Sequence, residues 1–327
     1  MTLSETEAYD SIVTSIDKQK SDSTASEYIR HVSRFRDWMD ERERSIFEAD
    51  SLYVEEHFEH MLDEGYSPST VRVRKAGLST FFKRAMKYSE AGRIDAEVSS
   101  NPTESVKLGR WTRMSQQSSK QQETNERVFY LKPNEVEELA SHVPTPTLRN
   151  ELIIRLLFQT GMRRGELCRL RLSDVELDTR VLSVSDTKSD TSRKVRYQPS
   201  IDFLMRQWIE VQRESVGMAD ESEYLFPTGR SLHLSGNRLN GMVRIAAENA
   251  GLQRAYGTDM NGNERHEITA HVLRHSFAME CVRQGWDVYY LKEAMGHHDI
   301  SVTVDNYLHG AQDDVLEEFR RKGPNSE

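Results

Sequence analysis

Residues 271–307 read HVLRHSFAMECVRQGWDVYYLKEAMGHHDISVTVDNY, and the rest of the chain is organised around them. His271 and Arg274 stand three positions apart, which places both on one face of a helix. A Gly-His pair follows at 296–297, and Tyr307 comes ten residues after that histidine. An arginine fork with imidazole donors can bind a phosphate diester, and a nearby tyrosine can attack the phosphorus and hold it covalently. This stretch has no carboxylate cluster or cysteine pair to carry a metal, so the predicted chemistry uses none.

The chain has 327 residues, a length that predicts two domains, each able to bury its own core. Residues 115–126 contain no apolar side chain and follow a stretch rich in helix breakers, which predicts a flexible linker at 113–127. The expected organisation is therefore a helical bundle at 1–112, this linker, and a second domain at 128–327.

The first domain shows helical patterns, with Asp50 and Ser67 as predicted N-caps and Pro68 in the first turn of the last helix. Apolar residues recur at helical spacing. The residues expected to face the core are Tyr28, Val32, Phe35, Met39, Leu52, Phe58, Met61, Leu62, Val71, Leu78, Phe81 and Phe82.

The charge is unevenly distributed. The formal net charge of -9 argues against a nucleic-acid partner, and residues 1–65 hold 17 acidic and 7 basic side chains. Residues 66–113 reverse the balance, with 10 basic and 4 acidic side chains. A basic stripe within an acidic protein can still be a phosphate footprint. The candidate DNA contacts are the basic residues between Gly65 and Ser89: Arg72, Arg74, Lys75, Lys83, Arg84 and Lys87.

The second domain mixes helices with a short strand pair. A strand-like entry at 128–132 precedes a helix that begins at Pro133, and a long apolar helix ends at Gly161. Residues 180–186 and 192–199 are predicted strands joined by a polar turn, and 255–267 is predicted to be a long polar loop. Further helices are expected near 200–216, 234–250, 271–284 and 287–295. The predicted fold class is mainly α, with a small β-sheet in the C-terminal domain.

Several motifs together make the family recognisable. GMRRGELCRL, the strand–turn–strand with TKSDTSRKVRY, HVLRH, GHHDIS and DNYLH occur in the order found in tyrosine recombinases of the phage-integrase type. The chain resembles these enzymes over about residues 128–310, and its first domain resembles their SAM-like core-DNA-binding domain. The resemblance implies an N-terminal helical bundle followed by a tyrosine-recombinase-type catalytic domain.

The resemblance also implies roles for individual residues. Arg163, with Arg164 as the alternative register, and Arg274 would clamp the scissile phosphate and stabilise its developing charge. Glu166 would hold Arg163 in position. An ordinary ion pair within the helix is the alternative, and the two are weighted equally. Lys188 would protonate the leaving 5′ oxygen as general acid, the alternative being a solvated turn lysine.

The remaining roles fall on two histidines and a tyrosine. His271 would exchange the proton of the tyrosine, His297 would donate a hydrogen bond to the phosphate, and Tyr307 would be the nucleophile. His271 and His275 have the spacing of a zinc helix, but no acid or cysteine follows at ligand spacing. No metal and no cofactor are therefore expected.

The implied function is site-specific DNA recombination through a 3′-phosphotyrosine intermediate, in integration, excision or resolution. A type IB topoisomerase-like relaxing enzyme and a non-catalytic DNA-binding protein are the alternatives. The expected partner is double-stranded DNA at a specific site, bound by a homotetramer. A monomer without DNA and an accessory directionality factor remain open options. No apolar run approaches the roughly 20 residues of a membrane span, and the first residues lack a signal-peptide core, so a cytoplasmic protein is expected.

Overall fold

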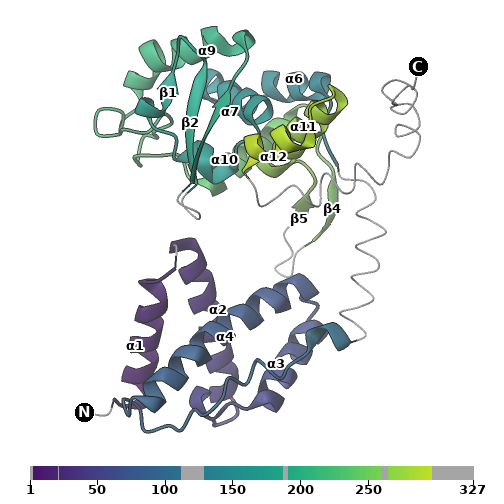
Figure 1. Ribbon diagram of the computed structural model, residues 1–327. Coiled ribbons are helices and arrows are strands. Elements are labelled where there is room, and N and C mark those ends of the chain that lie inside the picture. The colour runs from purple at the N-terminus through teal and green to yellow at the C-terminus, as the bar shows by residue number, and fades with distance from the viewer. Residues whose placement is uncertain (1–2, 21, 112–128, 187–190, 259–263, 297–327) are drawn as a thin grey trace, which may run out of the picture. The chain divides into compact units, whose positions relative to one another are not determined.

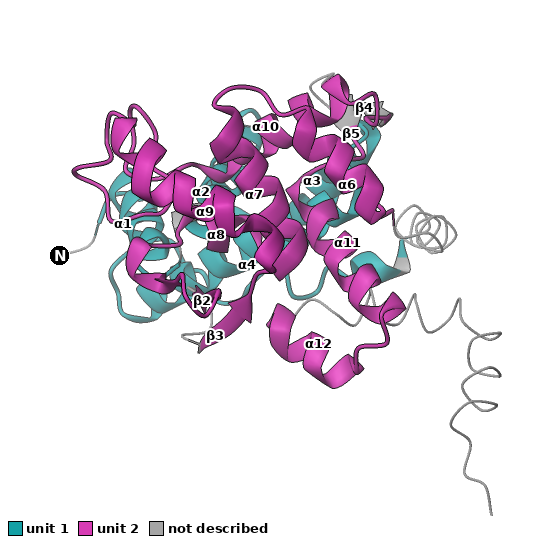
Figure 2. Ribbon diagram, turned by 90° about the horizontal axis from the view of Figure 1, so that it is seen from above, with its two compact units in different colours: residues 1–124 teal, residues 125–327 magenta. Residues whose placement is uncertain are grey.

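The chain folds into two compact units, residues 1–124 and 125–327. Figure 1 shows a computed structural model, which describes residues 3–20, 22–111, 129–186, 191–258 and 264–296. Figure 2 colours the two units separately, and each has a hydrophobic core of its own. The predicted linker at 113–127 lies outside the described residues.

Unit 1 is a helical bundle, as predicted. Its described α-helices are α1 (Glu5–Asp17), α2 (Asp22–Asp40), α3 (Ser51–Asp63) and α4 (Pro68–Glu90). The Oδ1 atom of Asp50 accepts hydrogen bonds from the backbone amides of Leu52 and Tyr53 in the first turn of α3, at 2.9 and 3.0 Å. The Oγ atom of Ser67 accepts one from the amide of Thr70 at 3.2 Å. Both predicted caps are confirmed, because each satisfies amides that the helix itself leaves unbonded.

Aromatic side chains form the centre of this bundle. Phe35 of α2, Phe58 of α3, and Phe81 and Phe82 of α4 are fully buried. The prediction for Leu52 is wrong, because this side chain is 60% exposed. The buried stripe of α3 is Val54, His57, Phe58 and Met61. At about 100° per residue, Leu52 lies about 200° from Val54 and so on the opposite face.

Unit 2 combines helices with two small antiparallel sheets. Its described α-helices are α6 (Pro133–Ser141), α7 (Thr147–Thr160), α8 (Arg164–Cys168), α9 (Asp202–Gln207), α10 (Gly236–Asn249), α11 (Ala270–Arg283) and α12 (Val288–Met295). The strands are β1 (Val175–Glu176), β2 (Val181–Asp186), β3 (Thr191–Arg196), β4 (Ala255–Thr258) and β5 (Glu264–His266).

Helix α7 is the central element of this unit. Its apolar residues are buried almost all round, including Leu152, Ile154 and Leu157, and it packs against α6, α11 and β3. The helix ends at Thr160, and its C-cap is Gly161, whose φ of 61° is left-handed. A Cβ at this position would also collide with the Phe277 ring of α11, so the close approach of the two helices requires glycine.

The β-hairpin of unit 2 is confirmed. Strands β2 and β3 pair antiparallel, with Val184 opposite Arg193 and Leu182 opposite Val195. Leu182, Val184 and Val195 are buried, so this face of the hairpin packs inward and Arg193 lies on it.

Two other predictions for unit 2 are corrected. Residues 129–132 form no strand; instead the amide of Leu131 donates to the Oγ of Ser276 at 2.8 Å, and the Leu131 side chain joins the core. The segment 255–267 is not a plain loop, because β4 and β5 pair antiparallel within it.

Candidate active site

Arg274 is a buried cation on α11. Its guanidinium donates from Nη1 to the carbonyl oxygen of Gly161 at 2.6 Å and from Nη2 to that of Met295 at 2.7 Å. The residue is 1% exposed, so these bonds form in a low-dielectric setting where they are strong. Arg274 therefore joins the ends of α7 and α12.

His271 lies one turn before Arg274 on α11. Its side chain is exposed, and its ring packs edge-to-face against that of His275, with the ring centroids 4.3 Å apart.

Arg163 reaches the same place from the start of α8. It is the N-cap residue of that helix, directly after the turn that Gly161 permits. Its Nη1 donates to Oε1 of Glu166 at 2.9 Å, and its Nη2 donates to the carbonyl oxygen of Gly296 at 3.2 Å. The neighbouring Arg164 packs instead beside Gly236 at the start of α10. The structure thus brings Arg163, rather than Arg164, to the vicinity of Arg274.

Glu166 is the carboxylate that holds this site together. Its side chain is 3% exposed, and its Oε2 accepts the backbone amide of Arg163 at 2.6 Å. Burial by itself raises the pKa of this carboxyl, but the hydrogen bonds and charges of Arg193 and then Arg163 outweigh it, so the pKa is lowered. Glu166 is therefore an ionised group that two guanidiniums share.

Arg193 also belongs to this site, and it is not among the residues that the motifs predict. Its Nη1 and Nη2 bind both carboxylate oxygens of Glu166 at 2.9 and 2.8 Å, and its Nε donates to the carbonyl oxygen of Ala294 at 2.8 Å. Its side chain is 13% exposed. One signal could have found it: in the predicted strand 192–199, Arg193 shares the inward face with Val195 and Tyr197, where a cation requires a partner.

The C-terminal end of α12 brings the three arginines together. The last carbonyls of a helix lack intrahelical partners and carry the negative end of its dipole. Here the carbonyl oxygens of residues 294–296 each accept a hydrogen bond from a different guanidinium. Arg193 donates to the carbonyl of residue 294, Arg274 to that of residue 295 and Arg163 to that of residue 296. We call these three residues with Glu166 the arginine cluster; it has more cations than anions and so favours an anionic ligand.

Three predicted site residues lie outside the described part of the chain. Lys188 falls between the end of β2 at Asp186 and the start of β3 at Thr191. His297 follows Gly296 at the end of α12, and Tyr307 lies further on.

The basic residues of α4 divide into two groups. Arg74 is buried, with its guanidinium 4.0 Å from the centre of the Tyr66 ring, so the structure uses this cation inside unit 1, contrary to the expectation of a DNA contact. Lys75 and Arg84 are half-buried and donate to unit 1 itself, to the Val106 carbonyl at 2.5 Å and the Ser15 hydroxyl at 2.6 Å. The exposed members are Arg72, Lys83 and Lys87.

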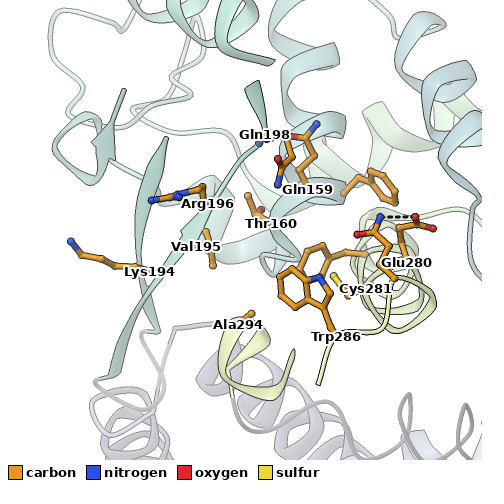
Figure 3. Close-up of a pocket in the computed structure, with 13 residues that line it drawn as sticks. Gln159, Thr160, Lys194, Val195, Arg196, Gln198, Glu280, Cys281, Trp286 and Ala294 are labelled. Carbon is orange, nitrogen blue, oxygen red and sulfur yellow. Dashed lines mark hydrogen bonds between the residues drawn. The ribbon is translucent and has the colours of Figure 1, made fainter. Parts of the chain in front are cut away.

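A separate cavity of about 570 Å³ lies next to the arginine cluster in unit 2. Figure 3 shows Val195 and Ala294 on one side of it and Cys281 and Trp286 on the other. Burial raises the pKa of the Cys281 thiol to about 12, so this sulfur stays protonated and is a packed group, not a nucleophile.

Among the helices that the structure describes, none is long and apolar enough to cross a membrane.

Comparisons with known proteins agree with this architecture. The profile of the phage integrase family matches residues 130–313, and that of the phage integrase N-terminal SAM-like domain matches residues 12–89. Tyrosine recombinase XerA of Thermococcus kodakarensis is 31% identical over 176 residues, which is 53% of this chain and 55% of that protein. The chain thus spans about half the length of that relative. Tyrosine recombinase XerD of Staphylococcus aureus is 24% identical over 318 residues, 94% of this chain and 95% of that protein.

Solved structures show the same fold. XerH site-specific recombinase bound to a palindromic difH substrate aligns with a TM-score of 0.67 at 19% identity, over 96% of this chain and 83% of that one. The Tn1549 transposon integrase in complex with transposon right-end DNA aligns with a TM-score of 0.66 at 18% identity, over 98% and 100%. The family match, which covers more than half of the sequence, confirms the resemblance seen in the motifs: the chain belongs to the phage integrase family.

Proposed function

We propose that this protein is a tyrosine site-specific DNA recombinase that breaks and rejoins strands through a 3′-phosphotyrosine intermediate. One observation carries the proposal: Arg163 and Arg274, from separate elements, converge on consecutive carbonyls at the end of α12. The next residue in the chain is His297. Two guanidiniums that converge in this way can bind the two non-bridging oxygens of a phosphate diester.

The proposed cleavage step is a transesterification at phosphorus. The phenolic oxygen of Tyr307 attacks, the bond to the 5′ oxygen breaks, and the DNA keeps a 3′-phosphotyrosine and a free 5′ hydroxyl. An unperturbed phenol has a pKa of about 10, so the exposed His271 accepts its proton. Lys188 supplies the proton that the departing oxygen needs.

Charge stabilisation and rejoining complete the cycle. Arg163 and Arg274 neutralise the charge that grows on the non-bridging oxygens, and His297 adds a hydrogen bond. A 5′ hydroxyl from the partner strand then attacks the phosphotyrosine and releases Tyr307. The covalent bond conserves the phosphodiester energy, so the cycle requires no nucleotide cofactor.

The DNA partner follows from the same reading. The proposed substrate is a specific duplex site bound by four protomers, with Arg72, Lys83 and Lys87 as the exposed cations of α4 that meet phosphates. The solved relatives include recombinases in complex with DNA, which supports this choice of ligand.

Trapping the covalent intermediate tests the proposal. A pool of duplexes with randomised centres and a nick, which lets the short cleaved strand diffuse away, is incubated with the full chain. DNA that stays attached to denatured protein is then sequenced. The expected result is a recovered site family joined through its 3′ phosphate, and no adduct with Tyr307→Phe. Failure of the wild-type chain to form an adduct, or an adduct that persists in Tyr307→Phe, would refute the proposal.

The same experiment separates the two alternatives. A topoisomerase-like enzyme would relax a supercoiled plasmid that carries no partner site. A non-catalytic binding protein would retain duplexes under native conditions and release all of them on denaturation.

A further inference from the structure

Arg193 connects three elements of unit 2 through one side chain. It belongs to β3, its fork binds the carboxylate of Glu166 on α8, and its Nε binds the carbonyl oxygen of Ala294 on α12. These contacts join residues that are 27 and 101 positions apart. A planar guanidinium has donors on two edges, so one arginine can bind a carboxylate and a carbonyl together, whereas one lysine ammonium cannot reproduce this geometry.

Both groups that Arg193 holds are themselves contacts of the proposed catalytic arginines. Glu166 accepts hydrogen bonds from the side chain and the backbone amide of Arg163. Ala294 immediately precedes the two residues, 295 and 296, whose carbonyls bind Arg274 and Arg163. A movement of Glu166 or of the end of α12 would therefore move the catalytic guanidiniums as well.

We propose that Arg193 is a positioning residue of the recombinase reaction, which fixes Glu166 and the end of α12 so that Arg163 and Arg274 face one phosphate. The inference rests on the proposed function. Arg193 does not have to touch DNA in this role. It acts through the other two arginines, and reactions of this kind lose rate when such groups are displaced by about 1 Å.

Hydrogen exchange of the full chain without DNA tests the positioning directly. Arg193→Gln is compared with Arg196→Gln, which makes the same change at an exposed arginine three residues along the same strand. Faster exchange in α8 and α12 is expected for Arg193→Gln only, with α6 and α10 unchanged. Unchanged exchange in α12, or an equal rise throughout unit 2, would overturn the inference.

Cleavage rates then test the link to catalysis, with the duplex selected in the adduct experiment as the probe. Arg193→Gln should slow single-turnover cleavage by about tenfold to a hundredfold, with duplex binding unchanged, while Arg196→Gln keeps the wild-type rate. Arg193→Lys keeps a positive charge beside Glu166, and should still be slower than wild type because it cannot bridge both acceptors. A wild-type rate for either Arg193 variant would count against the inference.

A double-mutant cycle of cleavage rates distinguishes positioning from general damage to the fold. If Arg193 acts through Arg163, then Arg193→Gln should cost much less rate in an Arg163→Lys background than in the wild type. Fold-changes that simply multiply would mean that Arg193 acts independently and would overturn the inference. If the wild-type chain forms no adduct, the proposed function fails, yet the exchange result still decides whether Arg193 holds α12.

Discussion

Replacing Glu166 by glutamine tests the electrostatic design of the arginine cluster. The change keeps the size of the side chain but removes its charge and turns one acceptor oxygen into a donor. That amide nitrogen would then face a guanidinium, because both carboxylate oxygens are in use: Arg193 binds them at 2.8 and 2.9 Å, and Arg163 binds Oε1 at 2.9 Å.

The expected loss of stability is large. Removing one partner of a buried charge pair costs roughly 3–5 kcal/mol, because the other charge stays buried without compensation. Glu166 is 3% exposed, but its partners Arg193 and Arg163 are 13% and 26% exposed, so water screens part of this cost. We therefore expect Glu166→Gln to lower the free energy of unfolding of unit 2 by about 3 kcal/mol.

Native-state hydrogen exchange in urea measures this quantity in the full chain, since the core amides of α7 report on unit 2 alone. Glu210→Gln is the matched control, because its pair with Arg206 spans 3.4 Å with both side chains about half exposed. Such a surface pair contributes about 0.5 kcal/mol or less.

The pH dependence provides a second check on the same variant. The pKa of Glu166 is lowered in the folded chain, so its carboxylate stabilises the native state above the unfolded pKa. That contribution disappears as the pH falls through the lowered folded pKa. The difference between wild type and Glu166→Gln should therefore shrink in acid. A loss no larger than that of Glu210→Gln at neutral pH, or a difference that does not change with pH, would refute this account.

Three further predictions concern single residues. Gly296→Ala should cost about 1–2 kcal/mol and slow DNA cleavage, since φ is 74° and the new Cβ would lie 3.4 Å from Nη1 of Arg163; thermal unfolding and adduct yield would show it. Burial lowers the pKa of His57 to about 3, so unit 1 should lose about 2 kcal/mol from this group between pH 7.5 and 5, as the unfolded chain takes up the proton. His57→Phe should remove that part of the pH dependence of α3 exchange. Phe58→Ala should cost about 3–5 kcal/mol and Leu52→Ala less than about 0.5 kcal/mol in urea unfolding; equal losses would contradict the burial pattern.

Local patterns predicted the elements of this protein well. The caps at Asp50 and Ser67, the apolar stripe of α4 and the hairpin of β2 and β3 all depend on residues close together in the chain. Side-chain hydrogen bonds at helix starts and strand alternation are short-range effects, so one sequence suffices to see them.

The errors arose where distant residues compete with local pattern. Leu52 fits an apolar helix but lies on the face of α3 that has no core to meet. The segment 129–132 is apolar enough for a strand, but the backbone amide of Leu131 donates a hydrogen bond to the hydroxyl of Ser276, which is 145 positions away. The basic run of α4 predicts a DNA contact at Arg74, but this side chain is buried and its guanidinium packs against the Tyr66 ring.

The sequence by itself determined the family, the helical character and the order of the motifs that carry Arg163 and Arg274, because each of these depends on residue types and short spacings. Only the tertiary structure decided that Arg193 joins them and that all three bind the end of α12. Those hydrogen bonds link residues 101, 133 and 21 positions apart. The packing of whole helices decides which distant donors bind the unsatisfied carbonyls at the end of a helix. Spacing along the sequence therefore does not predict these pairs.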